Sequence, residues 1–318
     1  MTPPVNVMTI DVEDYFHVSN FERVVDRGSW DGMESRVERN TDRLLELFAE
    51  AEVTATFFVL AWVAERFPRI VQRIVAGGHE IASHGYGHRL VYEQSSAQFG
   101  DDIRKAKAIL EDAAGARVEG YRAPSFSITN RSLWALDVLI EQGYRYDSSI
   151  YPIHHDRYGI PGSPREPYLI ERPAGTLIEV PGSTVRVASL TLPIGGGGYF
   201  RLLPYRWTSW GIAQLNRREG RSAVFYLHPW EVDPDQPRLP APWMKRMRHY
   251  GNLRATDARL RRLLREFSFG PMHTLLSQFE AQSAARDHTT RHSGGSAPRQ
   301  PSGAHPNDIV AAAVPEYR

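Results

Sequence analysis

The sequence contains no cysteine in its 318 residues. This absence excludes disulfide bonds and cysteine-based zinc sites, so a metal ion would have to be held by histidine and carboxylate side chains. An excess of one charge is also absent, because 38 lysine and arginine residues balance 37 aspartate and glutamate residues. The chain as a whole therefore has no electrostatic signature for nucleic acid or for an anionic membrane.

Long apolar segments are lacking as well. No uninterrupted apolar stretch approaches the ~18 residues that a membrane-spanning helix needs. The first residues, MTPPVNVMTIDVED, contain neither the basic nor the apolar region of a signal peptide before the first acidic side chains. We therefore expect a cytoplasmic protein without a membrane span.

Strand and helix patterns alternate along most of the chain. Runs rich in β-branched or aromatic residues, such as 53–60, alternate with helical patterns such as 99–115, which a glycine ends. This alternation is typical of a parallel α/β sheet or barrel. We predict an α/β barrel domain over 1–235, a helical extension over 236–281 packed on the barrel, and a disordered tail over 282–318, which is rich in serine, glycine, proline and histidine.

Three carboxylates lie at the end of the first predicted strand. Asp11, Glu13 and Asp14 follow an apolar run directly, and such crowded acids repel one another unless a positive group lies between them. On an extended strand Asp11 and Glu13 point to the same side. The arrangement raises the question of which positive group compensates them.

Further chemistry-bearing residues lie where later strands are predicted to end. His84 and His88 are four residues apart in a loop that contains two glycines, and two histidines with one carboxylate form a common catalytic metal set. Arg122 stands just before a strand-ending proline, and its forked donors suit a carboxylate. His228 closes an apolar strand and suits general acid–base catalysis. In parallel α/β folds, sites assemble at these strand ends.

Together, the segments TIDVED, HGYGH, RAP and LHP resemble the motifs of the polysaccharide deacetylase family, carbohydrate esterase family four. The resemblance covers residues 5–230. Four longer segments resemble a subfamily found in exosortase (PEP-CTERM) and exopolysaccharide gene clusters, and they extend the similarity to about residue 280. Their sequences are TIDVEDYFHV, YRAPSFSIT, PIGGGGYFRLLP and FYLHPWEVDPDQP. The family fold is a distorted, TIM-like (β/α) barrel.

The resemblance implies metal-dependent hydrolysis of N-acetyl groups on hexosamine residues of a polysaccharide. It implies that His84 and His88 hold a divalent ion, Zn²⁺ or alternatively Co²⁺, Ni²⁺ or Mn²⁺, with either Glu13 or Asp14 as the third ligand. Asp11 would be the general base that accepts a proton from the attacking water. Arg122 would hold Asp11, and a backbone N–H near Ser125 would help to stabilise the oxyanion. His228 would protonate the leaving amine.

The expected partner is an N-acetylated glycan or a lipid-linked oligosaccharide, with no nucleic acid. The residues expected to contact substrate are Pro124, Ser125, Phe126, Trp230 and Tyr199. The carboxylate that orients His228 is Asp147 or Glu231. A different activity stays open on the same fold, namely an amidohydrolase that acts on a small cyclic amide or imide.

Overall fold

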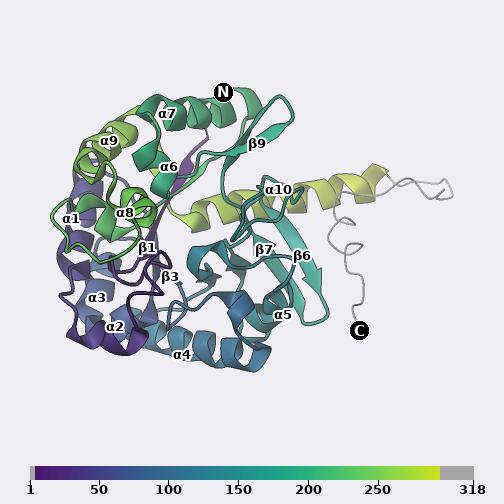
Figure 1. Cartoon of the computed structure of the whole chain (residues 1–318). Coiled ribbons are helices and arrows are strands. Elements are labelled where there is room, and N and C mark those ends of the chain that lie inside the picture. Colours follow the sequence, from purple (N-terminus) through teal and green to yellow (C-terminus); the bar gives the residue numbers. More distant parts are fainter. Residues whose placement is uncertain (1–3, 294–318) are drawn as a thin grey trace.

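The computed structural model describes residues 4–293, and only the backbone of residues 286–293 (Figure 1). Its strands are β1 Asn6–Val12, β2 Thr56–Val59, β3 Glu80–Ser83, β4 Gly120–Tyr121, β5 Tyr146–Asp147, β6 Tyr168–Arg172, β7 Gly175–Glu179, β8 Thr184–Val187, β9 Leu190–Pro193, β10 Val224–Leu227 and β11 Phe269–Gly270. Its helices are α1 Val37–Glu50, α2 Ala61–Arg66, α3 Pro68–Ala76, α4 Ser96–Ala114, α5 Trp134–Glu141, α6 Gly197–Leu202, α7 Tyr205–Gln214, α8 Trp243–Tyr250, α9 Leu253–Glu266 and α10 Met272–Ser293.

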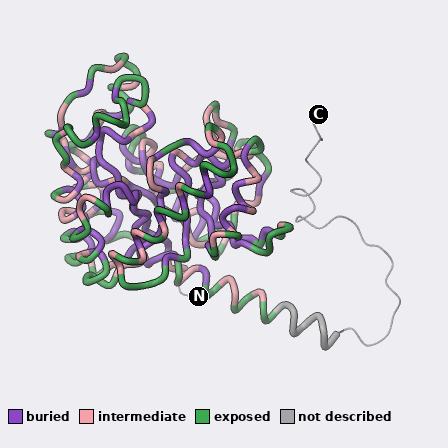
Figure 2. Tube along the Cα trace, turned by 90° about the horizontal axis from the view of Figure 1, so that it is seen from below, coloured by how far each residue is buried: buried purple, intermediate pink, exposed green. Residues whose placement is uncertain are grey.

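A curved, mainly parallel sheet organises the molecule, with helices around it (Figure 1). Its strand order is β10-β1-β2-β3-β4-β5-β7-β6, and β6 alone in this path is antiparallel to its neighbour. Every residue of β1 is buried, which explains its apolar sequence, because strands of a parallel sheet are covered on both faces. Figure 2 shows this buried interior enclosed by exposed helices and loops. The predicted α/β alternation is thus confirmed.

The sheet nearly closes through the chain that follows β7. Ser183 accepts a hydrogen bond from the backbone N–H of Val224 through its Oγ, at 2.6 Å, and Gly196 pairs with Tyr226 of β10. Gly196 has a φ of 119°, and a Cβ at this position would lie 2.0 Å from the carbonyl oxygen of Tyr226. Only glycine permits this approach. The result is a distorted barrel whose seam is covered by irregular chain.

The C-terminal extension is part of the barrel core. On α9, Leu253, Leu260 and Leu263 are buried with the central cluster, whereas its arginines lie outside or form ion pairs, as in an amphipathic helix. β11 pairs with β1, which adds a strand to the sheet that the sequence analysis did not expect. α10 continues as helix to Ser293, past residue 282 where the tail was predicted to begin. Residues 294–318 of that predicted tail lie outside the described residues, and the division into three parts stays a prediction.

A buried pair of carboxyl groups joins β5 and β7. Asp147 and Glu179 are direct neighbours in the register, and both are fully buried. Burial raises the pKa of both groups, and their mutual repulsion raises that of Glu179 further. Ser149 donates a hydrogen bond to Asp147, and the N–H of Ile150 donates one to Glu179. The pair is therefore stable only while it retains a proton.

We expect this pair to make stability fall with rising pH. A raised pKa means that the folded state binds more protons than the unfolded state at pH values between the ordinary pKa of the group and its raised pKa. The free energy of unfolding therefore decreases across that interval by up to about 1.4 kcal/mol per pH unit for each proton. Glu179→Gln should flatten this dependence, and Glu119→Gln, at an exposed carboxylate beside β4, should not. Urea unfolding at several pH values measures it, and parallel curves for wild type and Glu179→Gln would contradict the assignment.

Candidate metal centre

The carboxylates of Asp11, near the end of β1, and Glu13, just after it, lie at the carboxyl ends of the parallel strands. The N–H of Glu13 donates to the carbonyl oxygen of Asp11 at 3.0 Å, so the chain turns tightly after the strand. Val12, between them, is in the apolar core. Both acidic side chains are buried. Buried carboxylates of this kind require a compensating charge.

Glu13, His84 and His88 come together. Each offers a ligand atom, and these atoms lie within 4.8 Å of one another. Nδ1 of His84 lies 2.8 Å from the carbonyl oxygen of Arg122, which fixes that nitrogen as a donor and leaves Nε2 with a free lone pair. Burial lowers the pKa of His84 to about 4, so its ring is neutral, the form that binds metals.

The chemistry of this cluster fits a divalent cation. Oε2 of Glu13 lies 2.6 Å from Nε2 of His88, yet without hydrogen-bond geometry, and it is a buried oxygen without a hydrogen-bond partner. Burial alone would raise the pKa of Glu13, but His88, His228 and His84 lower it overall, so the carboxylate is ionised. One carboxylate and two imidazoles facing one point are a set that zinc accepts.

The loop that carries the two histidines is held rigidly. Gly85 and His88 both have positive φ values, 73° and 48°, so the segment is a loop, as its glycines predicted, and no helix. Asp102 of α4 accepts hydrogen bonds from the N–H groups of Tyr86 and Gly87, at 2.7 and 3.1 Å. These bonds position His88 without any contact to its ring.

Arg122 holds Asp11. Its Nη1 donates to Oδ1 of Asp11 at 2.7 Å and to Oγ1 of Thr9 at 2.8 Å. Its Nη2 donates to Oγ of Ser148 at 3.0 Å, and its Nε donates to the carbonyl of Ser148. The guanidinium also lies over the ring of Phe58 at 4.1 Å, and the side chain is only 1% exposed. Four hydrogen bonds thus hold this buried cation in place, and one of them fixes the Asp11 carboxylate.

His228 is oriented by Glu231, the second of the two predicted candidates. Nδ1 of His228 lies 2.7 Å from Oε1 of Glu231, and Nε2 points back toward Asp11 and Glu13, at 3.9 and 3.7 Å. Burial lowers the pKa of His228, but the Glu231 carboxylate outweighs it and raises the pKa to about 9. Arg201 of α6 donates to the other oxygen of Glu231. The buried ion pair between Arg201 and Glu231 therefore holds the His228 ring in its orientation.

Two predicted carboxylates lie elsewhere. Asp14 accepts hydrogen bonds from the Ser35 hydroxyl and from the N–H groups of Arg36 and Val37, so it caps the start of α1 and faces away from the cluster. Asp147 pairs with Glu179 and Ser149, and no contact joins it to His228. A long-range carboxylate could not be chosen from the sequence, whereas Glu231 is only three residues from His228.

The predicted substrate residues divide into two groups. Phe126 is buried against Tyr151 and Tyr226, with ring centroids at 5.2 and 5.1 Å, and Trp230 stacks between His228 and His249 while its Nε1 donates to Glu13. These two rings support the site from behind. Pro124 is buried as well. Ser125 and Tyr199 are partly exposed, and their hydroxyl groups lie 2.8 Å from that of Ser19 and 3.1 Å from that of Tyr158.

Three supporting residues were missed by the sequence analysis. Thr9 shares a face of β1 with Asp11, so the two-residue period could have identified it. Ser148 directly follows β5 and is one of two serines at a strand end. Arg201 is 30 residues from its partner Glu231 in the sequence, and no local pattern identifies it.

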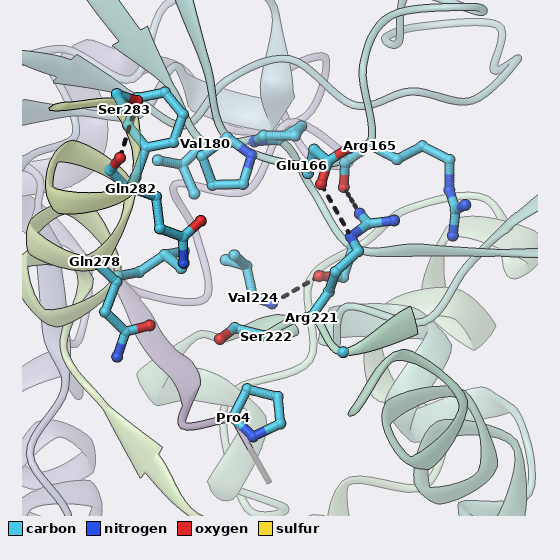
Figure 3. A pocket seen from close by; sticks show the side chains of 16 residues that line it. Pro4, Arg165, Glu166, Val180, Arg221, Ser222, Val224, Gln278, Gln282 and Ser283 are labelled. Atoms are coloured by element: carbon cyan, nitrogen blue, oxygen red, sulfur yellow. Dashed lines mark hydrogen bonds and ion pairs between the residues drawn. The ribbon is translucent and has the colours of Figure 1, made fainter. Parts of the chain in front are cut away.

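A cavity of about 210 Å³ lies at the other end of the strands (Figure 3). It is bordered by Pro4, Val224 and residues of α10, and its ionic groups, including Arg165 and Arg221, already bond to neighbouring acids and carbonyls. No histidine lines it. The chemistry gathers instead around the cluster of Glu13, His84 and His88, which is the candidate metal centre.

Comparison with protein families gives two adjacent matches. Residues 25–146 match the family model "Polysaccharide deacetylase", and residues 148–277 match "Domain of unknown function (DUF3473)". The chain is 32% identical over 114 residues to the peptidoglycan deacetylase of Helicobacter pylori, and 35% identical over 98 residues to the peptidoglycan-N-acetylglucosamine deacetylase of Bacillus cereus. These matches cover 36% and 30% of this chain, and 37% and 36% of those proteins.

Solved structures define the fold. A Mycobacterium smegmatis protein assigned as a polysaccharide deacetylase superposes with a TM-score of 0.57 at 21% identity, covering 89% of this chain and 96% of that one. Puue allantoinase gives 0.59 at 18% identity, covering 87% and 90%. The distorted barrel of polysaccharide deacetylases is therefore confirmed. The comparisons support the polysaccharide deacetylase family for this chain. Within residues 4–293, no helix has the length and hydropathy to cross a membrane.

Proposed function

We propose that this protein is a metal-dependent hydrolase that removes N-acetyl groups from hexosamine residues of a polysaccharide. The observation that carries the proposal is the convergence of Glu13, His84 and His88 beside the Asp11–Arg122 pair and His228. The family match begins after Glu13 and ends before His228. The roles of Asp11, Glu13 and His228 therefore rest on this geometry.

Glu13, His84 and His88 would hold the ion. Zn²⁺ suits two imidazoles and one carboxylate, and Co²⁺, Ni²⁺ and Mn²⁺ are the alternatives. A divalent ion bound there supplies Lewis-acid chemistry, polarising the acetyl carbonyl and making water more acidic. This charge, together with Arg122, also compensates the carboxylates at the end of β1.

Asp11 serves as the general base. Its Oδ1 accepts the hydrogen bond from Arg122, while Oδ2 lies 3.9 Å from Nε2 of His228, on the side of the histidine that faces the site. Arg122 holds the carboxylate in a fixed orientation, so that it is placed to accept the proton of the attacking water. The ion pair thus prepares the base before substrate binds.

His228 serves as the general acid. Because Glu231 engages Nδ1, the Nε2–H faces the site and can donate its proton to the leaving amine. The pair Asp11 and His228 would then act on opposite ends of the scissile amide. A backbone N–H near Ser125, in the tight turn after Arg122, would complete the oxyanion site.

The substrate is proposed from the relatives. The two curated relatives reported above are named as deacetylases of peptidoglycan, whereas the motifs resemble those of proteins from exopolysaccharide loci. On that resemblance we place the reaction in exopolysaccharide biosynthesis, on an N-acetylated glycan or its lipid-linked precursor. Tyr199 and Ser125, both partly exposed, would supply hydroxyl groups for sugar recognition. The allantoinase shares only the fold, so no observation favours a cyclic amide.

Acetate release tests this function. Purified protein should release acetate from N-acetylated glycans, lose that activity with a chelator, and regain it with Zn²⁺. His88→Ala should lose the bound metal and at least about a hundredfold of activity, more than the loss of a group that only orients a ligand. His273→Ala, at an exposed histidine on α10, should change neither. Chelator-resistant acetate release, or full metal content in His88→Ala, would overturn the assignment.

A further inference from the structure

Apolar side chains are exposed on one group of neighbouring elements. Val187 and Leu190 lie at the tip of the β8–β9 hairpin, and Leu190 is 61% exposed. Trp243 at the start of α8 is 72% exposed. The other exposed apolar residues of these elements are Leu202, Leu203, Trp210, Met244 and Met247. Large exposed apolar groups in such number mark an interaction surface.

These elements form one continuous face. Val187, Leu203, Arg206, Trp207 and Trp210 line a single shallow groove between the hairpin and α7. α6 contacts both α7 and α8. Leu202 at the end of α6 packs where a side chain on Gly251, just after α8, would otherwise lie. In Figure 1 the hairpin, α7, α6 and α8 succeed one another along one side of the barrel. We call this surface the exposed apolar surface.

The charges of this surface have one sign. Residues 184–218 and 236–256 contain no aspartate or glutamate, although the whole chain carries a net charge of only +1. Arg186 and Arg206 are exposed beside the groove, and α8 adds the exposed Arg246 and Arg248. Glu266 of α9, which reaches Tyr205, is already paired with Arg262. Positive charge thus surrounds the exposed tryptophans and aliphatic residues without an acidic neighbour on these segments.

We propose that the exposed apolar surface docks on a bilayer that contains anionic lipids. Tryptophan, leucine and methionine enter the headgroup boundary of a bilayer, and arginine and lysine bind its anionic headgroups. A second copy of the chain would bring like charges together, which disfavours self-association. Nucleic acid would leave Leu190, Leu202 and Met247 without partners. This inference concerns binding and does not rest on the proposed activity.

Vesicle co-sedimentation of the full chain tests the proposal. We expect binding to vesicles of equal parts phosphatidylcholine and phosphatidylglycerol, much weaker binding to phosphatidylcholine alone, and weakening by salt. Arg246→Glu with Arg248→Glu should reduce affinity by about fivefold or more per residue. Trp243→Ser with Met247→Ser should reduce it without removing the salt dependence. Leu169→Ser and Arg69→Glu, exposed positions on β6 and α3, are matched controls that should bind like wild type.

The salt titration of the unaltered chain keeps the test valid if a variant is unstable. The proposal is overturned if anionic and neutral vesicles bind equally, or if neither binds. It is also overturned if the control variants lose as much affinity as those of α8. Concentration-dependent dimerisation that Trp243→Ser abolishes would assign the surface to a second copy. Binding of single-stranded nucleic acid in place of vesicles would assign it to that polymer.

Discussion

Replacing Asp11 with asparagine is expected to reduce acetate release by about 10²- to 10⁴-fold while the metal content stays near that of the wild type. The amide cannot accept the proton of the attacking water, yet it still accepts the hydrogen bond from Arg122. Because Asp11 is not one of the three residues that would hold the ion, binding of metal should persist. Parallel measurements of initial rate and bound metal check this.

Asp14→Asn is the matched control, since it changes a carboxylate three residues further along the chain. Asp14 caps α1, so its change should cost about 1 kcal/mol of stability and leave turnover near wild type. Equal loss of turnover in both variants would show that Asp11 has no special role. Loss of metal in Asp11→Asn would show instead that Asp11 is a ligand.

Replacing Arg122 with methionine is expected to lower the free energy of unfolding by about 3–5 kcal/mol and to abolish activity. The change leaves the buried Asp11 carboxylate without its cation and removes the donors to Thr9 and Ser148. Urea denaturation measures the loss. Arg145→Met, at an exposed arginine paired with Glu119, should cost no more than about 1 kcal/mol.

A double-variant cycle separates the ion pair from simple loss of packing. If Asp11 is the destabilised group, then Asp11→Asn combined with Arg122→Met should recover part of the stability that Arg122→Met loses. Strict additivity of the two single changes would contradict coupling between these side chains. The double variant should remain inactive, because it lacks Asp11, the general base.

The residues of the candidate site could be located from the sequence, because they lie where the predicted strands end. His84, Arg122 and His228 each directly follow a strand, namely β3, β4 and β10, and parallel strands bring such ends together. The lengths of the strands are less predictable, because β4 consists only of Gly120–Tyr121. The N–H of Arg122 still donates to the carbonyl oxygen of Ser83 in β3, at 2.9 Å, which holds Arg122 beside the neighbouring strand.

The choice between neighbouring acids required three-dimensional contacts. Strand alternation favours Glu13 over Asp14 as the metal ligand. The turn after Asp11 keeps Glu13 beside the two histidines, while Asp14 bonds to the start of α1. Glu231 is the partner of His228, because Asp147 of β5 pairs instead with Glu179 of the neighbouring strand β7. Arg201 reaches Glu231 only through the packing of α6, which no local pattern encodes.

Anomalous diffraction from zinc-loaded crystals tests the central claim most directly. We predict one strong peak within about 2.0–2.2 Å of Nε2 of His84, a ring nitrogen of His88 and a carboxylate oxygen of Glu13. That peak should lie beside the Asp11–Arg122 pair. Absence of a peak there at saturating zinc, or a peak bound to Asp14 and other groups away from the two histidines, would contradict the account.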